Sequence, residues 1–150
     1  MTRINIIDPA LLSDQHLVAE YRETPMVPAA LKRTLASKRG YSRNRVPKQY
    51  TLNTGHVTFF YDKLGYLSKR YDQLVSEMLV RGMRPDLHRE LNFDGIPQEC
   101  FGDWTPTKPE QRVVVERISL RLRQRGDWYR QHGKRVDVEQ LITQMLAHVE

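Results

Sequence analysis

The sequence contains a single cysteine, Cys100, among its 150 residues. One cysteine can form neither an internal disulfide nor a cysteine-based zinc site, and such scarcity is typical of a reducing compartment. Long apolar runs are also missing, since no stretch approaches the ~18–20 residues that a membrane span requires. The first residues show no basic segment followed by an apolar one. We therefore expect a cytoplasmic protein without a signal peptide.

Acidic residues are absent between Glu23 and Asp62, although the whole chain has 18 of them. The same interval is rich in lysine and arginine, and a second basic stretch covers residues 112–135. The net charge is +6. Positive charge segregated in this way favours a polyanionic partner, such as nucleic acid, that approaches from one side. A solvated surface with an incidental positive excess is the simpler alternative.

The apolar pattern indicates an all-α fold, because apolar residues recur at steps of three and four and no hairpin stands out. A chain of this length suits one compact domain. Pro25 and Pro28 lie within the first helical pattern, so that helix must bend. Thr107 and Glu110 are spaced as a capping box for a later helix. We expect three main helices and a short C-terminal one, the main helices at about 14–38, 56–81 and 108–125.

The N-terminus carries a candidate nucleophile. A small residue at position 2 makes Met1 a good candidate for removal, which would leave Thr2 with the α-amine. An α-amine titrates near about 7.7–8.0 and a lysine near about 10.4, so far more of the α-amine is neutral and able to form an imine. Glu23, on the first predicted helix, is a carboxylate that could move protons or stabilise positive charge. Taken alone, Thr2 could lie in a disordered terminus and Glu23 could be an ordinary exposed glutamate.

The chain resembles the pyrimidine-dimer DNA glycosylase family in several ordered strings. These are the N-terminal Met1-Thr2-Arg3-Ile4-Asn5 and the segments 14–23, 55–64, 96–103 and 124–134. The resemblance spans about residues 1–135 and implies three helices around one core, with the N-terminal arm threaded between them. We expect residues 1–135 to form the glycosylase-like domain. Residues 136–150 are expected to pack on it as a helical extension.

The resemblance also implies roles for particular residues. The Thr2 α-amine would attack the sugar carbon that bears the damaged base, expel the base and leave an imine, and Glu23 would assist with proton transfer and charge. β-Elimination would then cut the strand. One departure is Met26, which stands where the phage-type enzyme has a basic residue. Trp128 could pack in the core instead of contacting DNA. The residues expected to contact DNA are Arg3, Gln15, His16, Arg22, Arg117, Arg121, Trp128 and Tyr129.

The expected function is therefore that of a DNA repair glycosylase and abasic-site lyase acting on cyclobutane pyrimidine dimers. Its partner would be double-stranded DNA containing such dimers or abasic sites. We expect no cofactor, no metal, no membrane association and no obligate protein partner, and a cytoplasmic, nucleoid-associated monomer. Two alternatives stay open: a glycosylase and lyase for another damaged or modified base, and a non-catalytic DNA-binding module on the same scaffold.

Overall fold

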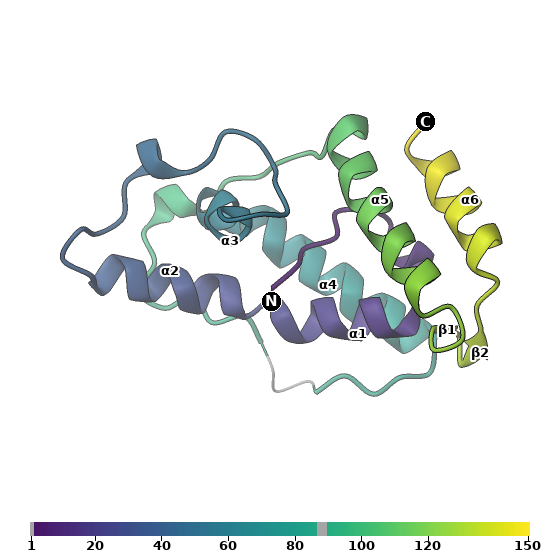
Figure 1. The fold of residues 1–150 in the computed structure, drawn as a ribbon. Coiled ribbons are helices and arrows are strands. Elements are labelled where there is room, and N and C mark those ends of the chain that lie inside the picture. The colour runs from purple at the N-terminus through teal and green to yellow at the C-terminus, as the bar shows by residue number, and fades with distance from the viewer. Residues whose placement is uncertain (1, 87–89) are drawn as a thin grey trace.

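Helices enclose an N-terminal arm in this computed structural model, which describes residues 2–86 and 90–150 (Figure 1). The α-helices are α1 (Asp14–Glu23), α2 (Met26–Ala36), α3 (His56–Phe59), α4 (Leu64–Val80), α5 (Lys108–Gln124) and α6 (Val138–His148). Short 3-10 helices are η1 (Pro9–Leu11), η2 (Arg43–Arg45), η3 (Phe60–Asp62) and η4 (Gln98–Cys100). Two short antiparallel strands, β1 (Arg130–Gln131) and β2 (Lys134–Arg135), form a hairpin. The predicted all-α class is confirmed.

The first predicted helix is in fact two helices. Thr24 and Pro25 separate α1 from α2, and the Thr24 hydroxyl donates to the Glu20 carbonyl at 2.7 Å. Proline has no N–H, so Pro25 and Pro28 both interrupt the helical hydrogen bonds. The prediction of one continuous helix over about 14–38 was wrong, although its bend was placed correctly. The break puts Glu23 at the last position of α1.

The second predicted helix is interrupted as well. Between α3 and α4, Lys63 leaves helical geometry at φ −129° and ψ 35° and pairs with Phe101 as an antiparallel bridge. The Gly102 N–H donates to the Asp62 carbonyl at 3.1 Å. A Cβ added at Gly102 would lie 2.5 Å from that oxygen, so only glycine fits there. The expected continuous helix over 56–81 was therefore wrong, because a distant segment pairs with it.

The C-terminal third holds α5, the hairpin and α6. The predicted capping box is confirmed: the Thr107 hydroxyl accepts from the Glu110 N–H, and the Glu110 carboxylate accepts from the Thr107 N–H. Helix α6 packs along α5 (Figure 1) and buries Leu141 and Met145. The hairpin was not predicted.

The N-terminal arm, residues 2–8, runs between α1, α4 and α5 (Figure 1). Ile4, Ile6 and Ile7 are fully or almost fully buried, which places the arm within the core. Burial of apolar side chains favours this path by about 1.5–3 kcal/mol each. Among the helices of residues 2–86 and 90–150, none is long and apolar enough to cross a membrane.

Candidate active site and nucleic-acid interface

The arm is held through its backbone at Ile4. Its N–H donates to Nε2 of His56 at 2.8 Å, and its carbonyl accepts from the Tyr50 hydroxyl at 2.8 Å. Both partners come from the segment around the start of α3 and are buried. Two side chains thus fix the arm two residues after Thr2.

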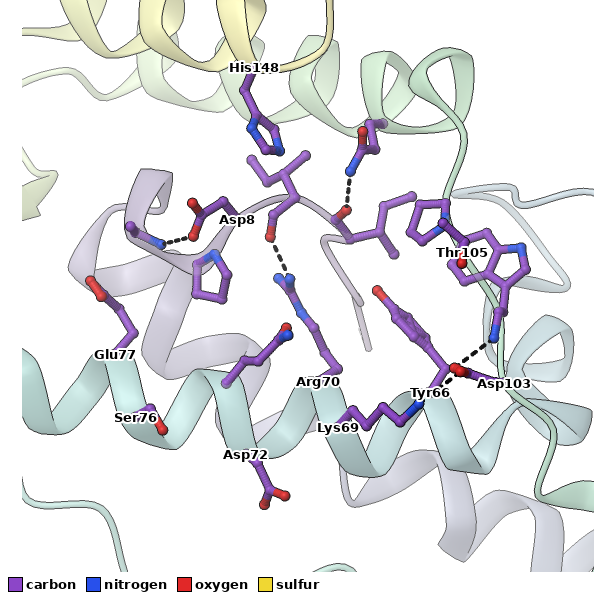
Figure 2. A pocket seen from close by; sticks show the side chains of 18 of the residues that line it. Asp8, Tyr66, Lys69, Arg70, Asp72, Ser76, Glu77, Asp103, Thr105 and His148 are labelled. Carbon is purple, nitrogen blue, oxygen red and sulfur yellow. Dashed lines mark hydrogen bonds and ion pairs between the residues drawn. The ribbon is translucent and has the colours of Figure 1, made fainter.

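A buried ion pair holds the next part of the arm. Arg70 of α4 contacts Glu20 of α1 through two hydrogen bonds, Nε to Oε2 at 2.7 Å and Nη2 to Oε1 at 3.0 Å. Glu20 also accepts the Asn5 N–H at 3.1 Å, and Arg70 donates to the Ile7 carbonyl. Figure 2 shows Arg70 reaching from α4 toward the arm. The two charges of the pair compensate each other, and the same two side chains provide hydrogen-bond partners for the Asn5 N–H and the Ile7 carbonyl.

The sequence analysis did not identify this pair. Glu20 is only 1% exposed. A signal was present, because Glu20 lies three residues after Leu17 and Arg70 three residues after Leu67, both on buried stripes. Opposite charges on two apolar stripes indicate a buried pair, since a charge inside a protein needs a partner.

The backbone also adopts a strained geometry within the arm. Ile6 has φ +30°, outside the regions that a β-branched residue normally occupies. Its carbonyl accepts a hydrogen bond from Gln111 Nε2 of α5 at 2.9 Å. Such a conformation persists only where the surroundings hold it in place, and it is found most often at functional sites.

Beyond the arm lies a cavity of about 230 Å³ that Glu23 shares with several cationic side chains. The Arg3 backbone N–H lies near enough to the Glu23 carboxylate to lower its pKa slightly, which places the start of the arm close to the end of α1. Burial, together with the charge of Glu20, raises the pKa of Glu23, and the nearby charge of Arg3 opposes this shift. A carboxyl with a raised pKa is a better proton acceptor near neutral pH. The cavity is lined by Arg3, Asn5, His16, Ala19, Glu20, Glu23, Arg117, Ile118, Arg121 and Tyr129.

Positive charge dominates the rim of this cavity. Burial and the neighbouring charges of Arg117 and Arg121 lower the pKa of Arg3, whose buried Nε has no hydrogen-bond partner within the described part of the chain. Arg117 and Arg121 project from α5 one turn apart. Three arginines around one cavity form a site for an anion such as a DNA phosphate.

His16 and Tyr129 close one side of the cavity. Their rings stack at 5.0 Å with an interplanar angle of 4°. The His16 Nδ1 lies 2.7 Å from the Ser13 hydroxyl, which caps α1. Burial and the charge of Arg121 lower the pKa of His16 to about 4. A neutral His16 is thus part of a packed wall.

Trp128 lies outside the core, with 47% of its surface exposed. The alternative that Trp128 packs in the core is therefore wrong, and about half of the side chain faces solvent. Arg125 lies over this ring, 4.4 Å from its centroid. Trp128 and Arg22 border a second hollow, of about 500 Å³, whose other lining residues are Asp14, Gln15, Val18, Ala19, Arg130 and Gly133.

Gln15 joins α1 to the hairpin. Its Nε2 donates to the Trp128 carbonyl at 2.8 Å, and its Oε1 accepts the Arg130 N–H at 3.0 Å. Both ends of the amide are therefore used within the protein. Arg22, one helical position before Glu23, is exposed.

Thr2 contacts Met26 at the start of α2. The Thr2 hydroxyl lies 3.4 Å from the Met26 sulfur, in hydrogen-bonding geometry, and Met26 is 52% exposed. The position that departs from the family pattern is thus directly beside the candidate nucleophile.

A larger hollow, of about 850 Å³, lies along the arm on the α4 side and is drawn in Figure 2. Several of its charged residues are paired, as in the contact of Lys69 with Asp103 at 2.8 Å. Its floor is formed by the arm and Arg70. This hollow does not contain Thr2 or Glu23, so it is not the candidate active site.

A model of the pyrimidine dimer DNA glycosylase family matches residues 1–91, more than half of the chain. The chain belongs to the pyrimidine dimer DNA glycosylase family. Membership implies pyrimidine dimer DNA glycosylase activity and binding of damaged DNA. The matched residues include the arm, α1 and both partners of the Glu20–Arg70 pair. The basic positions of α5 and the Trp128–Tyr129 pair of this glycosylase lie beyond the match.

Proposed function

We propose that this chain removes the base at pyrimidine dimers and cuts the resulting abasic site, using the Thr2 α-amine as the nucleophile. The observation that carries the proposal is the placement of the arm. Its backbone is fixed at Ile4, Asn5 and Ile7, and the Arg3 backbone N–H lies near enough to the Glu23 carboxylate to act on its pKa. The start of the chain is therefore held beside a half-buried carboxylate.

The first step is base release. The neutral amine of Thr2, exposed after loss of Met1, forms a bond to C1′ of the damaged nucleotide while the bond from C1′ to the base breaks. The base departs with the electron pair of that bond. A carboxylate at Glu23 stabilises the positive charge that develops on the sugar, as carboxylates do in glycoside cleavage.

The second step is strand cleavage. Opening of the sugar ring converts the C1′ adduct to an imine, in which the amine nitrogen is doubly bonded to C1′. The imine acidifies the hydrogen on C2′, which Glu23 accepts as a base. The C2′ electrons form a double bond to C3′ and expel the 3′ phosphate. Water then hydrolyses the imine and frees the amine. General base catalysis of this kind contributes about 10²–10⁴-fold.

DNA binding is proposed to use the arginine-lined cavity and the exposed ring of Trp128. Arg3, Arg117 and Arg121 would hold backbone phosphates, which orients the duplex without reading its sequence. Arg22 would add a contact at the neighbouring hollow. His16 and Tyr129 would form the wall of the site. Gln15 would act mainly by holding the segment from Trp128 to Arg130 that leads into the hairpin, since both ends of its amide are already bonded.

Borohydride trapping tests this proposal. Reduction of the imine should give a stable adduct with duplex DNA that contains either a pyrimidine dimer or an abasic site, and peptide mapping should place the adduct at Thr2. Glu23→Gln should bind the same DNA yet fail to release the base. An adduct mapping to a lysine, or full activity after acetylation of the α-amine, would refute the role of Thr2.

Met26 favours a second candidate, a glycosylase and lyase of the same mechanism for another damaged base. Its uncharged side chain contacts Thr2, where a basic residue would have offered a phosphate contact. Incision of oxidised or alkylated duplexes, with none on dimer-containing DNA, would support this candidate. Binding of both DNAs without any trapped adduct would instead indicate a non-catalytic module.

A further inference from the structure

His56 sits at the point where the arm is held nearest to Thr2. It is the first residue of α3 and only 2% exposed. Its ring is fixed by edge contacts with Tyr50 and Phe60, whose centroids lie 5.4 Å and 5.5 Å away. A side chain packed in this way has one orientation in which to meet the arm.

The hydrogen bonds of His56 determine its tautomer. Nδ1 lies 2.8 Å from the Thr51 carbonyl, which can only accept, so Nδ1 carries the hydrogen. Nε2 receives the Ile4 N–H at 2.8 Å, so it must present a lone pair. Only the neutral ring with hydrogen on Nδ1 satisfies both partners. A proton on Nε2 would face the Ile4 N–H, and two donors would oppose each other.

We propose that His56 is a positioning residue: its neutral ring helps to fix the Thr2 amine by accepting the Ile4 N–H, and protonation of Nε2 breaks this hold on Ile4. The role of Thr2 in this inference rests on the proposed function. The link between His56 and the arm does not.

The surroundings of His56 keep it neutral. Burial lowers the pKa of His56 most, and the positive charges of Arg3 and Arg117 lower it further. The hydrogen bond to Thr51 and the negative charge of Glu20 act in the opposite direction. Ile4 is therefore held by His56 at neutral pH, and this hydrogen bond is lost on the acid side of the ordinary histidine range. Activity that falls below the pKa of the α-amine should then fall a second time, more steeply.

Nuclear magnetic resonance on the wild-type chain tests the link without any DNA. The His56 ring should show hydrogen on Nδ1, and the Ile4 amide proton should shift and exchange faster with the same pH midpoint as the ring. That midpoint should lie below about 6.5, the ordinary histidine value. The inference would be overturned if the shift and the exchange rate of the Ile4 amide proton did not change as the ring titrates, or if the ring carried its hydrogen on Nε2.

Two substitutions separate the two bonds of His56. His56→Gln places an amide oxygen near the position of Nε2 and can still accept from Ile4. His56→Asn keeps a donor for Thr51 and removes the acceptor for Ile4. At saturating abasic DNA, we expect His56→Gln to retain roughly a third or more of the wild-type trapping rate. His56→Asn should be slower by about tenfold to a hundredfold, because small displacements of a reacting group cost this much.

The affinity for DNA should stay within about twofold in both variants, and their melting temperatures should be similar, since each loses one hydrogen bond. At low pH the logarithm of the trapping rate should fall with a slope that is steeper by one in wild type than in His56→Gln, because the α-amine and Glu23 titrate in both. Equal losses in both variants would show a general structural role and refute the inference. If the wild-type chain forms no adduct, the proposed function fails, and the resonance experiment still decides the link between His56 and Ile4.

Discussion

Replacement of Arg70 by methionine should destabilise the fold strongly. Both side chains of the pair are almost fully buried, at 3% exposure for Arg70 and 0% for Glu20. Removing one partner of a buried pair leaves an uncompensated charge and costs about 3–5 kcal/mol. The Ile7 carbonyl also loses its donor, which adds about 1 kcal/mol or more. The expected loss of about 4–6 kcal/mol is comparable with the whole stability of a small domain, about 5–15 kcal/mol.

Urea unfolding followed by circular dichroism at pH 7 measures this loss. The matched control is the double variant Arg70→Met with Glu20→Gln, which removes both charges and keeps an acceptor for the Asn5 N–H. It should recover at least half of the lost free energy. If Arg70→Met is already unfolded in buffer, recovery of a folded state in the double variant still tests the reasoning. A single variant that loses under about 1 kcal/mol, or a double variant no better than the single one, would refute the reasoning.

Three further predictions concern the site. From about pH 6.5 down to pH 4, the free energy of unfolding of wild type should fall by about 3 kcal/mol because of His16. The unfolded chain binds a proton at this residue in that range, whereas the folded imidazole, with its pKa lowered to about 4, does not. His16→Asn should flatten this part of the pH profile measured by urea unfolding. Glu23→Gln should abolish base release and yet raise the melting temperature slightly at pH 7, since burial raises the pKa of Glu23 and disfavours its charged form; the gain should vanish near pH 3, where the wild-type carboxyl is protonated. Arg121→Gln should reduce the slope of log binding constant against log salt by about 0.9 in titrations, as for one lost phosphate contact.

Each of these predictions has its own control. Arg123 lies on the same helix as Arg121 but is bonded to Glu139 of α6 at 3.0 Å, so Arg123→Gln should leave the salt slope unchanged. An equal drop in both arginine variants would mean a general effect of net charge. A wild-type stability profile that is flat between pH 6.5 and 4 would contradict the assignment for His16, and a lower melting temperature in Glu23→Gln at pH 7 would contradict the assignment for Glu23.

The periodic features of the sequence were sufficient for the all-α class, the helix at 108–124 and its capping box. They did not predict the break at Lys63, because it depends on pairing with Phe101, which is remote in sequence. The hairpin after α5 was missed for a local reason. His132 has a positive φ of 53° and is followed by Gly133 at 76°. The usual sequence signals of a two-residue hairpin turn are Asn-Gly, Asp-Gly and Gly-Gly, and His-Gly is not one of them.

The roles of single residues were harder to predict than the elements that carry them. Glu23 was named as a candidate, but its pKa is raised mainly by burial and further by the charge of Glu20, and both depend on the folded structure. His56 lies within the segment 55–64 that resembles the family, but no role was predicted for it. A histidine that precedes apolar residues does not indicate its hydrogen-bond partner. Trp128 could not be assigned to core or surface, because an aromatic residue after a helix is equally common in both.

The hydrogen bonds that hold Ile4, Asn5, Ile6 and Ile7 are made by their main-chain atoms, so for these bonds the length of the arm matters more than the choice of apolar side chain. Substitutions of one apolar residue for another at Ile4, Ile6 or Ile7 leave the atoms that are held in place. One residue inserted between Arg3 and Ile4 would keep the hydrogen bonds from Ile4 onward and push the free end outward by up to about 3.3–3.6 Å, roughly the span of one extended residue. The distance along the chain from Ile4 to Thr2 therefore determines where the α-amine lies. One inserted residue should move this proposed nucleophile away from the sugar carbon that it is proposed to attack.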